Sequence, residues 1–263
     1  MVEQASEKGV RIVAVSVGNT RVTCAGCDGR EIGAMRSLGL EDADATAREI
    51  ASMASEHEAA ALVVATVNPS FSEPLIAALR SASGLGVYRV GTDVGLPNAG
   101  GVDADAKTGQ DRLLAALAAY ESLQQACVVV DAGTAITVDF VDGEGVFLGG
   151  AIAPGLRMML GALHDHTDAL PHVAVEDPGE EVFGKNTERA MLHGSVYSAR
   201  GLVRLMTERF AEAYEAYPLI VATGGDAQLL FADDELVDRI VPDLVLRGIA
   251  LACERTLGDG EEI

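Results

Sequence analysis

Short apolar runs alternate along the chain with longer segments in which apolar residues recur every three or four positions. The short runs predict buried strands, and the longer spacing predicts amphipathic helices. The expected strands lie within residues 11–20, 61–67, 86–90, 127–134 and 219–222. The expected helices cover residues 41–60, 72–83, 111–124, 156–164, 186–215 and 243–255. Strands that alternate with helices in this way predict an α/β fold, with mixed or parallel sheets flanked by helices.

The beginning of the chain is repeated about 115 residues later. The apolar run 11–17 leads into a turn of small residues, and the run 127–132 does the same. Each run is followed by a second β-rich stretch and an Asp-Gly pair, Asp28-Gly29 and Asp142-Gly143, which is a strong hairpin signal. The repeat predicts two related halves, residues 1–122 and 123–263, with the ligand cleft between them.

Charge and composition narrow the classes of function. The chain of 263 residues is 49% hydrophobic and carries a formal net charge of −21. A surface this acidic repels phosphate backbones, so a general nucleic-acid binder is excluded. A phosphorylated ligand would need backbone N–H groups, a helix N-terminus or a metal ion. No apolar run is long enough for a membrane span, and residues 1–10 do not resemble a secretion signal, so we expect a cytoplasmic protein.

Two patterns resemble metal sites but favour simpler interpretations. Cys24 and Cys27 have zinc-knuckle spacing without a second pair, so reduced thiols in a strand and its turn are expected. His164 and His166 flank Asp165 at the end of an expected helix. Helical residues two positions apart point in different directions, which favours an exposed polar helix end.

Two Gly- and Thr-containing turns are the first candidates for chemistry. They are Ser16–Thr20 and Asp131–Asp139, one at the start of each half. Glycine lets the backbone approach a ligand closely, and threonine supplies a hydroxyl and an N–H group for a phosphate oxygen. Asp131, at the end of an apolar strand, could hold a cation. The alternative is a pair of ordinary hairpins.

Two further segments are ambiguous on spacing alone. Gly109–Arg112 opens an expected helix, where Asp111 could be a helix cap or a carboxylate base beside the cation Arg112. Thr223–Asp226 follows a buried strand. Such a turn could lie against a nucleotide or could simply connect a strand to a helix.

Taken in order, the segments SVGNT, GQDR, DAGTAITVD, FLGGAIAPG, GKNT and ATGG resemble the type III pantothenate kinases. The resemblance runs from about residue 11 to residue 255. That family belongs to the actin-like ATPase and sugar kinase superfamily. The resemblance therefore implies duplicated ribonuclease-H-like domains, in agreement with the repeat. It also implies the transfer of phosphate from ATP to pantothenate, giving 4′-phosphopantothenate in the first step of coenzyme A synthesis.

The resemblance also implies roles for individual residues. Asp111 corresponds to the base that deprotonates the pantothenate hydroxyl, with Gly109, Gln110 and Arg112 beside it to hold the substrate. Thr187 corresponds to a pantothenate contact near a homodimer interface. Asp131 corresponds to the site of a monovalent cation, K⁺ or NH₄⁺, and Mg²⁺ or another divalent ion accompanies the ATP. The expected nucleotide-binding residues are Ser16, Gly18, Asn19, Thr20, Gly133, Thr134, Gly224 and Gly225.

Three positions depart from the family pattern. Ser16 stands where the family has Asp, Thr23 where it has a basic residue, and Val102 where its pantothenate pocket has Tyr. A hydroxyl cannot replace the charge of a carboxylate near Mg²⁺, although Asp139 or Asp226 could supply that charge. Two alternatives to a pantothenate kinase therefore stay open. One is a catalytically weak family member that binds ligands or regulates, and the other is a kinase for another small hydroxyl acid.

An apolar stripe in the expected helix 186–215 bears on oligomeric state. Leu192, Val196, Ala199 and Val203 recur at spacings of four, three and four, which places them on one helix face. The stripe could form the homodimer interface, or it could pack on the sheet of its own half.

Overall fold

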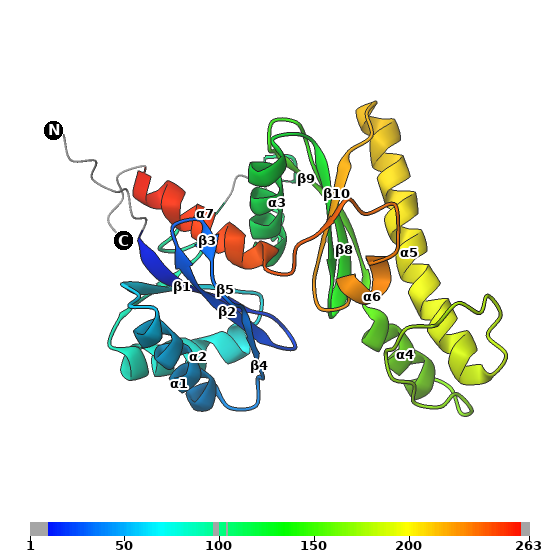
Figure 1. Cartoon of the computed structure of the whole chain (residues 1–263), viewed down its shortest axis with the longest axis horizontal. Helices are drawn as coiled ribbons and strands as arrows, with labels where there is room; N and C mark the ends of the chain where they lie inside the picture. The colour runs from blue at the N-terminus through cyan, green and yellow to red at the C-terminus, as the bar shows by residue number, and fades with distance from the viewer. Residues whose placement is uncertain (1–9, 97–99, 104, 259–263) are drawn as a thin grey trace. The chain divides into compact units, whose positions relative to one another are not determined.

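The computed structural model describes residues 10–96, 100–103 and 105–258, which form two compact units (Figure 1). The polar N-terminal segment 1–9 lies outside the described residues. The first unit takes the described parts of residues 1–98, 105–118 and 243–263, and the second takes those of 99–104 and 119–242. In the described part of the chain, no helix is both long and apolar enough to cross a membrane.

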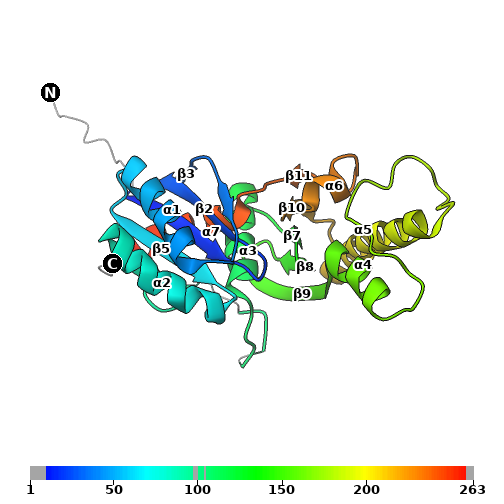
Figure 2. The ribbon, with the colours of Figure 1, turned by 90° about the horizontal axis from the view of Figure 1, so that it is seen from below.

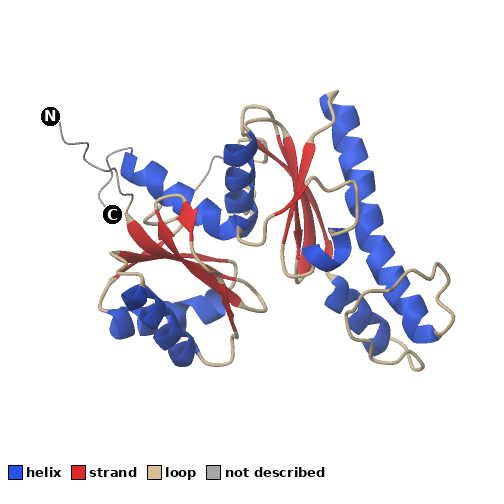
Figure 3. Cartoon of the chain, in the orientation of Figure 1, coloured by secondary structure: helices blue, strands red, loops and turns tan. Residues whose placement is uncertain are grey.

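The first unit is a mixed sheet with helices on both faces (Figure 3). Its strands are β1 (Arg11–Val17), β2 (Val22–Asp28), β3 (Glu31–Ile32), β4 (Arg36–Leu38), β5 (Ala61–Thr66) and β6 (Gly86–Arg89). The order is β3-β2-β1-β5-β6, with β4 also paired to β2. The pair β1–β2 is antiparallel, whereas β5 runs parallel to both β1 and β6. The carboxyl ends of β1, β5 and β6 therefore lie at one edge.

Helices α1 (Ala43–Glu56) and α2 (Pro69–Ser83) cover one face of this sheet. The carboxylate of Asp42 caps α1 by accepting from the N–H groups of Asp44 and Ala45, and the Asn68 amide oxygen caps α2. Helix α7 (Leu244–Gly258) lies on the other face, against β1, β2 and β5. The α-carbon of Gly248 lies so close to Leu114 that an added Cβ would be 2.1 Å from the Leu114 carbonyl oxygen.

The second unit is built on the same plan. Its strands are β7 (Cys127–Ala132), β8 (Ala135–Val141), β9 (Phe147–Pro154), β10 (Leu219–Thr223) and β11 (Arg239–Ile240), in the order β11-β10-β7-β8-β9. As in the first unit, an antiparallel hairpin comes first, and its first strand pairs in parallel with a later strand. This confirms the prediction of duplicated mixed sheets flanked by helices.

Three helices complete the second unit: α4 (Leu156–Asp165), α5 (Thr187–Tyr214) and α6 (Ala227–Phe231). Helix α5 runs along one face of the sheet, with α4 beside its first turns (Figure 2). Leu192, Val196, Ala199 and Val203 of α5 are all buried in the core formed with β7, β8 and β10. The stripe therefore packs on its own sheet, and the interpretation of these four side chains as a dimer interface is wrong.

Two local expectations differ from the structure. The expected halves met at residues 122 and 123, whereas residues 243–258 group with the first unit because α7 packs on its sheet. The Asp28-Gly29 turn forms as expected, with Gly29 at a φ of 57°. At Asp142-Gly143 the turn is longer. There the Asp142 carboxylate accepts from the N–H groups of Glu144 and Val146, and the positive φ falls on Gly145.

The cysteines and histidines agree with the simpler interpretations. All four cysteines are free and buried, and burial raises the pKa of the Cys24 and Cys27 thiols to about 11. His164 and His166 are exposed at the end of α4, where His164 Nδ1 lies 2.8 Å from the Leu170 carbonyl oxygen. Among the described residues, no group of three or more His, Cys, Asp or Glu side chains could hold a metal ion.

Candidate active site

The segment Gly109–Arg112 is fixed at the carboxyl edge of the first sheet. Helix α3 (Gln110–Leu123) begins there. The Gln110 amide oxygen accepts from the N–H of Thr66 at 3.1 Å, and its amide nitrogen donates to the Val90 carbonyl at 2.9 Å. Thr66 ends β5, and Val90 follows β6. Gln110 therefore joins the ends of two parallel strands to α3, a positioning role that the sequence did not indicate.

Asp111 lies in the first turn of α3, next to the residue that joins the strands. Its Oδ1 accepts from the N–H of Arg112 at 2.8 Å. A Cβ added to Gly109 would lie 2.5 Å from that oxygen, so a larger residue there would displace the carboxylate from this position. Asp111 follows the first helical residue, so it is not the N-cap of α3, and the fold holds its carboxylate at the strand edge.

The first candidate phosphate loop lies at the same edge, because it follows β1. The N–H of Gly18 donates to the Arg21 carbonyl at 3.0 Å, which closes the turn between β1 and β2. The Asn68 amide nitrogen reaches the Gly18 carbonyl at 3.4 Å, while its amide oxygen caps α2. Asn19 and Thr20 are exposed at the tip of the loop. The loop and the Asp111 segment are thus gathered within one unit.

The two departures in this loop are direct neighbours. Ser16 on β1 pairs with Thr23 on β2, and directly opposite residues of antiparallel strands point to the same face. The position where the resemblance implies an acidic residue is therefore paired with the position where it implies a basic one. In this chain a neutral pair, Ser and Thr, occupies both.

The second unit gathers the other candidate nucleotide residues at the carboxyl ends of β7 and β10. Asp131 and Thr223 are register partners on these parallel strands. Gly224 has a φ of 93°, and a Cβ added there would lie 2.4 Å from Asp131 Oδ1 and 2.5 Å from the Ala132 carbonyl oxygen. The Thr223–Asp226 turn is therefore pressed against the Asp131–Thr134 loop.

A third segment, which the sequence did not assign to the site, meets the same loop. The N–H of Gly155 donates to the Thr134 carbonyl at 3.0 Å, and an added Cβ would lie 2.1 Å from the Gly133 carbonyl oxygen. Gly155 ends the quoted FLGGAIAPG motif and precedes α4. The sequence shows that a glycine precedes a helix, but only the fold shows that this glycine packs against the Asp131–Thr134 loop.

The two acids that could have replaced a charge at Ser16 both lie in the second unit. Asp226 is buried and forms an ion pair with Arg157, so its charge has a partner. Asp139 is buried within β8, where a Cβ added to Gly150 would lie 2.4 Å from its carboxylate. Neither acid belongs to the first loop.

Thr187 is the first residue of α5, and residues 177 and 178 of the preceding segment are hydrogen-bonded to that helix. Asn186 caps α5 by accepting from the N–H of Arg189, and the Arg189 guanidinium donates to the Asp177 and Pro178 carbonyls. Val102 also lies in the second unit, 3.5 Å from where a Cβ of Gly149 would be. The role of Thr187 toward pantothenate therefore stays a prediction, and so does the effect of Val102 at the position where the resemblance implies Tyr.

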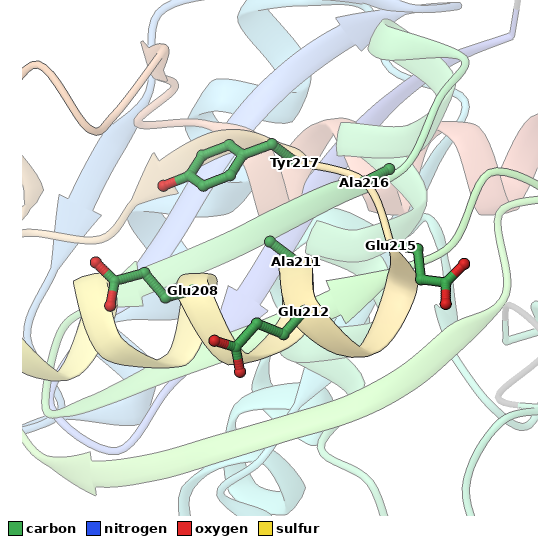
Figure 4. A pocket seen from close by; sticks show the side chains of 6 residues that line it. All are labelled: Glu208, Ala211, Glu212, Glu215, Ala216 and Tyr217. Atoms are coloured by element: carbon green, nitrogen blue, oxygen red, sulfur yellow. The ribbon is translucent and has the colours of Figure 1, made fainter.

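A hollow of about 440 Å³ lies at the end of α5, away from all of these residues (Figure 4). It is lined by Glu208, Ala211, Glu212, Glu215, Ala216 and Tyr217. Three carboxylates would repel a phosphate or a carboxylate ligand. The hollow therefore does not fit the chemistry of the candidate site.

Comparison with known proteins decides the family. A family model described as type III pantothenate kinase matches residues 12–209. The type III pantothenate kinase of Zymomonas mobilis is 33% identical over 257 residues, covering 93% of this chain and 92% of that protein. This chain belongs to the type III pantothenate kinase family. The family member from Syntrophotalea carbinolica is 34% identical over 199 residues, covering 75% of this chain and 77% of the relative.

Solved structures agree on the fold. A Baf family transcriptional activator from Campylobacter jejuni aligns with a TM-score of 0.61 at 18% identity, covering 94% of this chain and 99% of that one. The activator of 2-hydroxyisocaproyl-CoA dehydratase from Clostridium difficile, with bound ADPNP, aligns with a TM-score of 0.53 at 14% identity, covering 97% and 98%. These likenesses show that the fold is shared with these two proteins. The roles proposed for individual residues rest on the sequence motifs and not on these structures.

Proposed function

We propose that the chain transfers the γ-phosphoryl group of ATP to the terminal hydroxyl of pantothenate, in the first step of coenzyme A synthesis in the cytoplasm. The observation that carries this proposal is the placement of Asp111. The segment GQDR of this chain matches the family's GxDR motif, and Gln110 fixes it at the edge where β5 and β6 end. The same edge carries the first phosphate loop, so a base and a phosphate-binding turn share one unit.

Phosphoryl transfer depends mainly on positioning and on neutralisation of charge. In the proposed mechanism, the Asp111 carboxylate takes the proton of the pantothenate hydroxyl as the hydroxyl oxygen attacks the γ-phosphorus. The bond from the γ-phosphorus to the β,γ-bridging oxygen breaks, and ADP leaves. Arg112, the next residue, supplies a positive charge for the pantothenate carboxylate. Backbone N–H groups around Gly18, Gly133 and Gly224 hold the phosphates, as a chain of net charge −21 requires. The base that starts the reaction thus belongs to α3, and the phosphate contacts belong to turns.

The residue proposed to hold a monovalent cation is Asp131. Its carboxylate lies at the carboxyl end of β7, beside Thr223 of β10, and hard oxygen donors of this kind suit K⁺. A bound K⁺ or NH₄⁺ supplies positive charge near the transferring phosphate, and Mg²⁺ accompanies the ATP. Asp131 would hold the monovalent cation.

Turnover should therefore be faster in K⁺ or NH₄⁺ than in Na⁺ at equal ionic strength. Substitution of Asp131 by Asn should remove this difference, because the amide carries no charge to hold the ion. The measurement is the initial rate of ADP release in matched chloride salts. Equal rates of the parent protein in K⁺ and Na⁺ would contradict the assignment of a specific cation site.

The proposed enzyme is a homodimer that pairs through the outer face of α5. The four stripe residues are buried inside the second unit, so the proposed dimer interface uses the exposed face of α5. Gly194, Tyr197, Ser198, Gly201 and Leu205 are exposed at helical spacing, and Val182 and Phe183 before α5 are each 77% exposed. Small residues between apolar ones let a second helix approach closely.

Sedimentation should give a mass of about twice 27.3 kDa at micromolar concentration. Leu205→Glu should shift the protein toward the monomer, because it places a charge on the exposed face of α5. Met35→Glu is the matched control, since Met35 is an exposed apolar residue of the first unit. A parent protein that sediments as a monomer would refute the dimer.

A further inference from the structure

Two segments of the second unit meet the Asp131–Thr134 loop, and each is held there by a glycine. Gly155, before α4, donates to the Thr134 carbonyl, and Gly224, after β10, lies against Asp131 and Ala132. The N–H of Asp226 adds a bond of 2.9 Å to the Ala132 carbonyl. The Gly155 segment and the Thr223–Asp226 turn are thus each fixed to the Asp131–Thr134 loop through the backbone.

One ion pair joins the first turn of α4 directly to the Thr223–Asp226 turn. Nη1 of Arg157, in the first turn of α4, lies 3.2 Å from both carboxylate oxygens of Asp226. The Asp226 side chain is only 6% exposed, whereas that of Arg157 is 57% exposed. A buried carboxylate with one guanidinium partner depends strongly on that partner.

Neither residue follows the usual preference of its position in a helix. Asp226 occupies the N-cap position of α6, where Asp usually accepts from the helix N–H groups, but its side chain caps nothing. Arg157 places a positive charge in the first turn of α4, where the helix dipole opposes a cation. Residues that break local rules for a shared contact indicate a constraint imposed by function.

We propose that Arg157 is a positioning residue for ATP, acting through Asp226 to hold the Thr223–Asp226 turn against the Asp131–Thr134 loop. The inference rests on the proposed function, because it assigns the nucleotide to these two turns. Arg157 sets the separation of the two turns. Its loss therefore weakens ATP binding and leaves the Asp111 base in the other unit untouched.

Substitution of Arg157 by Gln should raise the KM for ATP about tenfold, with the KM for pantothenate unchanged and kcat within about twofold of the parent. Arg157→Lys should recover most of the ATP affinity, because it restores the charge beside Asp226. Arg204→Gln is the matched control. Arg204 is 59% exposed and pairs with the mostly buried Asp234 of the same unit, at 3.8 Å.

Direct ATP binding, measured by calorimetry on all four proteins, separates failure of the inference from failure of the proposed function. A parent that binds ATP without pantothenate-dependent turnover would refute the proposed kinase reaction, while the dissociation constants would still test Arg157. If Arg157→Gln binds ATP as tightly as the parent and loses only as much thermal stability as Arg204→Gln, the pair is purely structural. A parent that binds no ATP would refute both.

Discussion

Substitution of Asp111 by Asn is expected to lower kcat by about 10² or more, the usual effect of losing a general base. The amide matches the carboxylate in shape, and its oxygen can still accept from the N–H of Arg112. The fold and ATP binding should therefore be preserved. The measurement is kcat together with the melting temperature and the dissociation constant for ATP.

Asp42→Asn provides the control for this substitution. Asp42 caps α1 in the same unit, and Asn caps helices as well as Asp does, so neither activity nor stability should change. If Asp111→Asn turned over like the parent, the Asp111 carboxylate would only stabilise the first turn of α3, and the proposed mechanism would lose its base.

Gly224→Ala is expected to have the second large effect, on both stability and ATP use. The residue has a φ of 93°, and the new Cβ would lie 2.4 Å from Asp131 Oδ1 and 2.5 Å from the Ala132 carbonyl oxygen. Strain at positive φ and overpacking each cost about 1–3 kcal/mol, so the free energy of unfolding should fall by about 2–6 kcal/mol. The KM for ATP should rise as the turn moves away from Asp131.

Thermal unfolding and ATP kinetics measure the two effects of Gly224→Ala. The control is Gly161→Ala in α4, where an added Cβ meets nothing within 4 Å. Alanine in a helix interior should stabilise that protein by about 0.5–1 kcal/mol. If Gly224→Ala kept the stability and the ATP kinetics of the parent, the close approach of this turn to Asp131 would not matter for either.

The sequence predicted the parts of the fold that depend on local patterns. The hairpins β1–β2 and β2–β3 were visible because an apolar run leads into a small-residue turn and Asp28-Gly29 ends the second β-rich stretch. Helix α5 was visible because its apolar residues recur at helical spacing over 28 residues. The candidate residues were found through ordered motifs, and in the fold Gly133 and Gly224 lie close to Asp131.

The contacts that the sequence did not predict join segments far apart in the chain. Gln110 bonds to Thr66 and Val90, and an amide side chain gives no sign of its partners. Helix α7 packs on the first sheet although it follows the second in sequence. The apolar stripe of α5 showed which face is buried, but not what covers it. Periodicity identifies a buried face, and only the tertiary structure identifies its partner.

The pairing of Ser16 with Thr23 changes the interpretation of the first loop. Taken separately, each residue is a departure from the pattern that the resemblance implies. The structure shows that the two departures are directly opposite residues of β1 and β2, so they have to be interpreted together.

The central claim is that this chain phosphorylates pantothenate at the expense of ATP. The most direct test incubates the purified protein with ATP, pantothenate, Mg²⁺ and K⁺, and follows ADP release together with the mass of the product. We predict one 4′-phosphopantothenate for each ADP, with ADP release dependent on pantothenate and lost in Asp111→Asn. ADP release that is absent, or that is the same with and without pantothenate, would contradict the account.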